Sequence, residues 1–169
     1  MSRRVNRLIL PLALCGVGAA VCLAVLYPTV AADPKPETLK SNVVGFEEAR
    51  SRTADWGEMR IYFTGQTLAT KDVLTAVAVV EPGKAVHRAH RHPHEEYLVV
   101  VQGSGAWSLD GKESPAKQGD ILYVEPWVYH GLVNSGDEKL IFVVFRYNGK
   151  GIEIPTRPFE EDTDEGPGD

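Results

Sequence analysis

Cysteine is nearly absent from this sequence of 169 residues, which has only Cys15 and Cys22. Both lie in an apolar stretch near the amino terminus, so the rest of the chain cannot form a disulfide bond. A body without cysteine is compatible with an oxidising and with a reducing compartment. The cysteine content therefore excludes a disulfide-stabilised body but does not identify where the protein works.

Positive charge is also scarce outside the amino terminus. Residues 33–169 hold 15 lysines and arginines against 23 acidic residues, a net charge of −8. Proteins that bind nucleic acid or an anionic membrane surface usually present an excess of basic residues. The charge balance therefore argues against both kinds of partner.

Residues 1–32 have no acidic residue and carry the signature of a targeting segment. Three arginines fall within residues 2–7, an apolar run covers residues 8–26, and small residues lead up to Ala32. This order predicts a signal peptide that is cleaved after Ala32. The apolar run is also just long enough to span a bilayer, so an uncleaved transmembrane anchor helix is the alternative. Both readings place the body outside the cytoplasm, in the periplasm or secreted, or anchored to the membrane by this helix.

The remaining chain divides into three parts. Residues 33–58 are polar and contain two early prolines, which predicts a linker, with a short helix over residues 46–52. Residues 59–152 are expected to form one β-rich domain. Residues 153–169 are acidic and contain few apolar residues, which predicts a disordered tail.

Short β-strands separated by glycine and proline turns are predicted within residues 59–152. The best hairpin signal is Asp110-Gly111, because a type I′ turn needs positive φ at its two central residues. This pattern favours an all-β sandwich or barrel. The predicted strands cover residues 59–64, 73–80, 97–101, 106–109, 120–124, 128–133 and 140–147.

Histidine is rare but concentrated, since four of the five histidines fall within residues 87–94. His90 and His92 are two residues apart, so on a β-strand they would share one face, and Glu96 has the same parity. Two imidazoles and a carboxylate aimed at one point suit Fe, Mn, Zn, Ni or Co. The ligand set alone does not choose among these metals.

The stretch around these histidines resembles the first motif of the cupin family, G-x5-H-x-H-x3,4-E-x6-G. His90, His92, Glu96 and Gly103 fall in register with that motif, while Gly83 stands one residue too early for its first glycine. A second stretch resembles the other cupin motif, G-x5,7-P-x-G-x2-H-x3-N.

Gly119, Pro126, His130 and Asn134 match this second motif. The middle glycine is missing, and the spacing from Pro126 to His130 is one residue shorter than the pattern. The resemblance covers about residues 70–147. It implies a double-stranded β-helix, or jelly-roll barrel, and a divalent metal bound by His90, His92, Glu96 and His130. Many cupins pair as dimers through sheet edges, so a homodimer is expected as well.

Other polar residues near the motifs receive less specific predictions. His94 is expected at the mouth or surface, while His87 and Glu95 are expected to face solvent. The amide of Asn134 is expected to tie a turn to the backbone. Four aromatic residues are candidates for a pocket or for the core: Trp127, Tyr129, Tyr123 and Phe142. Arg60, Arg146 and Tyr62 lie on predicted strands whose orientation remains open, and an arginine that faces the interior would bind a carboxylate or phosphate.

Two functions follow from these predictions. The first is a metal-dependent enzyme, either a dioxygenase or an isomerase or lyase, acting on a small oxygenated molecule. The second is an exported, non-enzymatic module that binds a small ligand or a metal. A cupin fold supports either function, because fold alone does not fix activity.

Overall fold

The structure is a computed structural model, and it describes residues 37–158. The chain separates into the units Met1–Pro34 and Lys35–Asp169, and the second contains all the described residues. The predicted signal peptide or anchor, and the end of the predicted acidic tail, lie outside the described residues. Within residues 37–158, no helix is long and apolar enough to cross a membrane.

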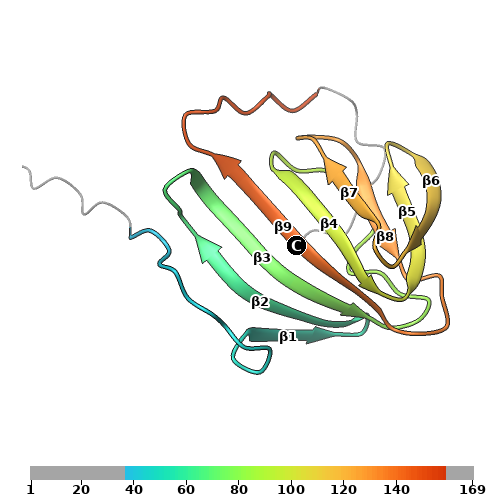
Figure 1. The fold of residues 1–169 in the computed structure, drawn as a ribbon. Helices are drawn as coiled ribbons and strands as arrows, with labels where there is room; N and C mark the ends of the chain where they lie inside the picture. Colours follow the sequence, from blue (N-terminus) through green and yellow to red (C-terminus); the bar gives the residue numbers. More distant parts are fainter. Residues whose placement is uncertain (1–36, 159–169) are drawn as a thin grey trace, which may run out of the picture. The chain divides into compact units, whose positions relative to one another are not determined.

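All the regular structure of the described residues is β-strand, in two antiparallel sheets (Figure 1). The strands are β1 (Arg50–Ala54), β2 (Gly57–Gly65), β3 (Thr70–Val80), β4 (Glu95–Gln102), β5 (Ser104–Leu109), β6 (Lys112–Lys117), β7 (Ile121–Val124), β8 (His130–Val133) and β9 (Leu140–Gly149). The larger sheet has the order β1-β2-β3-β9-β4-β7, and the smaller sheet has the order β6-β5-β8. The prediction of an all-β fold is confirmed.

The core lies between the inner faces of the two sheets. Every second side chain is buried over residues 76–80 of β3, 96–100 of β4 and 140–144 of β9, as the two-residue period of a strand requires. Leu98 and Phe142 of the larger sheet belong to the same apolar cluster as Trp107 and Leu132 of the smaller sheet. Burying one side chain of this size stabilises a fold by about 1.5–3 kcal/mol. The burial of the inward-facing apolar side chains is thus what joins the sheets.

The hairpin predicted at Asp110-Gly111 joins β5 to β6, with Leu109 opposite Lys112. Both turn residues have positive φ, 49° for Asp110 and 72° for Gly111. This is the backbone conformation that an Asp-Gly pair adopts most readily. The hairpin prediction is therefore confirmed.

The short helix predicted over residues 46–52 is wrong. A single turn ends at Ala49, whose N–H donates to Gly45 O at 3.1 Å, and β1 follows at once. Each residue of β1 is exposed, so the strand is stabilised by its backbone pairing with β2 and not by apolar burial. Its polar sequence offers no alternation for sequence reasoning to detect. Strand β6 was missed for the same reason.

Candidate metal centre

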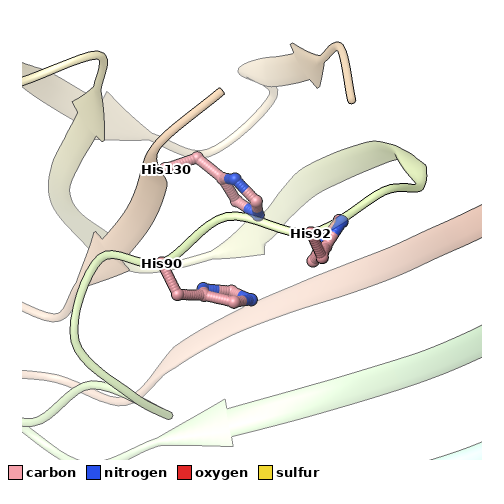
Figure 2. A group of neighbouring side chains, drawn as sticks. All are labelled: His90, His92 and His130. Atoms are coloured by element: carbon pink, nitrogen blue, oxygen red, sulfur yellow. The ribbon is translucent and has the colours of Figure 1, made fainter. Parts of the chain in front are cut away.

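Three imidazoles come together where the loop before β4 meets the start of β8. His90 and His92 lie in that loop, and His130 is the first residue of β8. One ring nitrogen from each lies within 4.8 Å of the others, a spacing that can hold a metal ion. Figure 2 shows the three rings gathered around one region. The structure thus brings together the three histidines that the two motifs single out.

The expected strand through His90 and His92 is absent. Only His90 makes an isolated bridge, to His130, and β4 begins after Pro93 and His94. Proline has no backbone N–H and interrupts strand pairing, which explains why regular structure does not continue from His92 into β4. The two imidazoles approach each other through loop geometry, with ring centroids 5.2 Å apart.

Backbone hydrogen bonds hold the two histidine-bearing segments in place. The N–H of His90 donates to the carbonyl of His130, and the N–H of His130 donates to the carbonyl of His90, both at 2.9 Å. The N–H of Trp127 donates to the carbonyl of His92 at 2.8 Å. Trp127 has a φ of 68°, unusual for a bulky residue, in the loop that is one residue shorter than the cupin pattern. This tight turn fixes the approach to His130.

Glu96 brings a carboxylate to the same place from β4. Its Oε2 lies 3.2 Å from Nε2 of His92, and its Oε1 lies 3.3 Å from Nε2 of His130. Adjacent ligands at right angles on a metal with bonds of about 2.1 Å would be about 3 Å apart. The two distances are therefore short enough for Glu96, His92 and His130 to hold one metal ion together.

Burial of Glu96 by itself raises the pKa of its carboxyl group. The contacts with His130 and His92 outweigh burial and lower the pKa of Glu96 to about 2. Burial also lowers the pKa of His90, to about 3, helped by the neighbouring His87, His130 and His92. At neutral pH the carboxylate is charged and the His90 imidazole is neutral, and both are the forms that bind a metal.

The hydrogen bonds of the rings show which nitrogens are available to a metal. Nδ1 of His130 lies 2.9 Å from the carbonyl of Val128, so it donates its proton there and leaves a lone pair on Nε2. That Nε2 is buried and has no aligned hydrogen-bond partner among the described residues. Nδ1 of His92 instead accepts the N–H of His94 at 3.3 Å. Nε2 of His92 then carries a proton, which a metal would have to displace.

Other polar residues near the histidines have separate contacts. Nε2 of His94 lies 3.3 Å from Oδ1 of Asp72, and burial lowers the pKa of its imidazole, with a further contribution from Arg146. Glu95 accepts the hydroxyl proton of Tyr123 at 3.0 Å. His87 is exposed as expected, yet its ring centroid lies 3.9 Å from that of His90. Sequence parity gave no sign of this ring contact.

Asn134 has the structural role that its sequence position predicts. It is fully buried, and its Nδ2 donates to the carbonyls of Val80 at 2.9 Å and Glu138 at 2.8 Å. Its Oδ1 accepts the N–H of Gly136 at 3.0 Å. The amide therefore ties the turn after β8 to the end of β3.

A cavity of about 740 Å³ opens onto the three histidines and Glu96. This volume lies within the range of small-molecule sites. Phe142 is the one predicted aromatic residue that lines it, while Trp127, Tyr123 and Tyr129 do not. Eight large apolar side chains contribute to its wall: Met59, Ile61, Leu74, Val86, Leu98, Leu132, Phe142 and Val144.

The two candidate arginines on predicted strands separate clearly. Arg146 of β9 lines the cavity. Arg60 of β2 does not, since its guanidinium pairs with Glu58 at 2.9 Å and with Glu47 at 3.5 Å and lies over the ring of Phe46. Tyr62 is also absent from the cavity wall.

Comparison with known proteins identifies the class of domain. Residues 76–146 match the family model described as a cupin domain. An RmlC-like cupin from Shewanella frigidimarina has a similar fold, with a TM-score of 0.53 and 20% identity over 66% of this chain and 95% of that one. The chain therefore contains a small cupin-type domain, and its antiparallel sheets agree with a jelly-roll barrel.

Two curated relatives show what similar sequences do elsewhere. A gentisate 1,2-dioxygenase from Streptomyces is 31% identical over 94 residues, which cover 55% of this chain and 24% of that protein. The dimethylsulfoniopropionate lyase DddW of Ruegeria pomeroyi is 33% identical over 89 residues, which cover 52% of this chain and 57% of that protein. The match thus spans about a quarter of one relative and little more than half of the other.

Proposed function

We propose that this protein is a metal-dependent enzyme, a dioxygenase or an isomerase or lyase, that acts on a small oxygenated molecule. In this proposal His90, His92, Glu96 and His130 hold a divalent transition metal, one of Fe, Mn, Ni or Zn. The observation that carries the proposal is the convergence of three imidazoles and one carboxylate on the wall of a cavity of about 740 Å³. The similarity to a dioxygenase and to a lyase supports the same reading.

The donor set fits a divalent metal. Nε2 of His130 is buried without an aligned hydrogen-bond partner in the described residues, and His90 and Glu96 have the protonation states of ligands at neutral pH. When bound, such a metal would polarise a substrate oxygen as a Lewis acid or, if redox-active, supply electron-transfer chemistry. The single carboxylate leaves about one positive charge on a divalent centre, which favours anionic or chelating oxygen ligands.

The protein's own contribution is to position the substrate and exclude water. Leu98, Phe142 and Val144 form part of an apolar wall beside the ligands, so a substrate in the cavity would lose most of its hydration. Electrostatic interactions in such a site are stronger than in water. The apolar wall therefore strengthens the contacts that the polar groups of the cavity make.

The alternative is a non-enzymatic module that binds a small ligand or a metal. Among the lining residues that the structure describes, His87 carries the only imidazole or carboxyl group outside the four proposed ligands, and burial lowers the pKa of its imidazole. A general acid or base independent of the metal would therefore have to be His87. This scarcity of acid–base groups keeps the binding module as a real second candidate.

Elemental analysis of protein purified without chelators or added metal tests the proposal, with His130→Ala in parallel. Near-stoichiometric Fe, Mn, Ni or Zn that falls in the variant would support the centre. Oxygen uptake by an iron-loaded sample with candidate substrates would favour the dioxygenase, and tightly held zinc with ligand affinity but no turnover would favour the binding module. Absence of metal from both proteins would contradict the proposal.

We also propose that the protein is exported and forms a homodimer. The outer face of the larger sheet supports association, since Tyr97 on β4 lies between Tyr123 on β7 and Phe145 on β9. All three side chains are exposed, as is Ile121 in the next row of β7. Contiguous exposed apolar side chains commonly mark an association surface.

A further inference from the structure

The cavity has a charge opposite to that of the chain. Five lining residues are arginines and one is acidic, whereas the whole sequence has a net charge of −5. A cleft with one sign of charge and low-dielectric walls concentrates ligands of the opposite sign. The five arginines are Arg50, Arg52, Arg88, Arg91 and Arg146.

Arg146 lies beside the proposed metal ligands. On β9 it is the direct partner of Glu96 on β4 and of Leu74 on β3, and both partners line the cavity. Directly opposite residues of an antiparallel pair share a face and have Cβ atoms about 4.5–5.5 Å apart. The side chain of Arg146 therefore leaves the sheet next to that of Glu96.

Arg146 is half-buried and has no hydrogen bond or ion pair with any residue in the described part of the chain. A partly buried charge without a partner is costly, unless a ligand supplies the opposite charge. Guanidinium groups bind planar carboxylates through two parallel hydrogen bonds. This geometry makes Arg146 a suitable anchor for a carboxylate beside the proposed metal ligands.

Arg50 and Arg52 provide a second positive group on β1. They are the register partners of Ile61 and Met59, whose side chains line the cavity. Both arginines are exposed, and neither has an ion pair within residues 37–158. Because β1 is an edge strand, these two residues lie at the border of the cavity. Strands β2 and β3 separate them from Arg146 on β9.

The opposite face of β1 and β2 has a different arrangement of charges. Ser51 and Arg60 are register partners, and each contacts Oε1 of Glu58, at 2.5 Å and 2.9 Å. The arginine on that face is thus neutralised by nearby carboxylates, while Arg50 and Arg52 are not. Arg50 and Arg52 are therefore available to an anionic ligand, whereas Arg60 is not.

We propose that the cavity selects a small dicarboxylate with an apolar body. One carboxylate binds Arg146 beside the metal ligands, and the other binds Arg50 and Arg52 at the border. The apolar side chains of the wall contact the body of the ligand. The inference deepens the proposed function, on which it rests for the location of the reacting end, because it names the substrate class of that site.

Calorimetric titration of the protein as purified, with its metal content recorded, tests this proposal. The probes are glutarate, adipate, isophthalate and terephthalate, each with its monocarboxylate and its diamide. At least one dicarboxylate should bind ~10-fold or more tighter than its monocarboxylate, since a second charge-assisted hydrogen-bonded pair contributes about that much. Diamides should bind more weakly still. Equal affinity for the three forms, or no binding by any probe, would overturn the proposal.

Variants then assign each end of the ligand. Arg146→Gln should weaken both the dicarboxylate and the monocarboxylate by ~10-fold or more, whereas the double variant R50Q/R52Q should weaken only the dicarboxylate. Arg60→Gln is the matched control on the opposite face and should bind like wild type. Arg146→Lys, which keeps the charge but loses the planar fork, covers the case in which R146Q does not fold. Wild-type affinities in the Arg146 and R50Q/R52Q variants would contradict the assignment.

The two proposals fail in distinguishable ways. Dicarboxylate binding that depends on the arginines, in a protein that takes up no metal, would remove the metal-dependent enzyme and leave the anion site intact. Stoichiometric metal without a preference for dicarboxylates would remove the dicarboxylate site and leave the metal centre intact.

Discussion

Glu96 and Arg146 are direct partners on the neighbouring strands β4 and β9, and both side chains line the same cavity. Glu96 is in contact with His92 and His130, whereas Arg146 has no ionic partner among the described residues. A single row of the larger sheet thus carries a proposed metal ligand and a proposed anion anchor side by side. The sheet would hold these two groups in a fixed relation to each other, while His90 and His92 are supplied by the loop before β4.

Removing one ligand should empty the metal centre. His92→Ala and Glu96→Ala are each expected to weaken metal binding by more than the ~10- to 100-fold that changes outside the ligand set produce. His94→Gln is the matched control, because His94 contacts Asp72 and is not among the proposed ligands. Metal content after dialysis measures the effect. Full occupancy in both alanine variants would contradict the site.

Acid should destabilise the metal-free protein in two stages. His90 has a pKa of about 3 when folded, below its usual 6.5, so the unfolded chain takes up this proton first and stability falls as the pH drops from 6.5 to about 3. Glu96 has a pKa of about 2 when folded, below its usual 4.5, so its contribution is lost between pH 4.5 and about 2. Thermal unfolding against pH in the presence of a chelator measures both stages.

Variants separate the two stages. His90→Gln should flatten the loss that begins near pH 6.5, and Glu96→Gln should flatten the loss that begins near pH 4.5, relative to the metal-free wild type. A wild-type pH profile for H90Q would show that His90 does not titrate between the folded and unfolded states as described.

Loss of the Asn134 amide should destabilise the fold and not the metal centre alone. Asn134→Ala leaves the carbonyls of Val80 and Glu138 and the N–H of Gly136 without their partner in a buried position. We expect a decrease of roughly 2–4 kcal/mol in the free energy of unfolding, measured by denaturant titration. Asn42→Ala, at an exposed position, should change it by less than about 0.5 kcal/mol.

Sequence reasoning succeeded where the determinant is local. Apolar runs bounded by turn residues predicted β3, β4 and β9, and the Asp110-Gly111 pair predicted its turn, because each depends on a few adjacent residues. Strand β1 escaped prediction, since its pairing with β2 uses only backbone groups. The order of the sheets also lay beyond reach, because β3 pairs with the distant β9.

In the candidate site, too, features set by adjacent residues could be predicted and features set by the pairing of distant strands could not. The motif spacing correctly singled out the histidines that the structure brings together, although the strand expected through His90 and His92 is a loop. The inward orientation of Arg146 could not be read from the chain, because it depends on the register between β9 and β4. The cavity contacts of Arg50 and Arg52 depend in turn on β1, which sequence reasoning missed.

Export has a direct test in the native host. The mass of the purified protein should correspond to a chain that begins near Asp33 if residues 1–32 are a cleaved signal peptide. A chain that begins at Met1 and partitions with the membrane fraction would support the anchor helix instead. A full-length chain in the cytoplasmic fraction would contradict both forms of the proposal.

The proposed homodimer should depend on the outer face of β4, β7 and β9. Ile121 is 63% exposed and lies in the row next to Tyr97 and Tyr123, so Ile121→Asp would place a charge in the proposed interface. Burying an unpaired carboxylate is costly, and we expect this variant to sediment with the mass of one chain while the wild type sediments with the mass of two. Leu68→Asp is the matched control, since Leu68 is 90% exposed and lies between β2 and β3, outside this face. A wild-type mass of one chain would rule out the homodimer, and an unchanged dimer in the Ile121 variant would move the interface to another face.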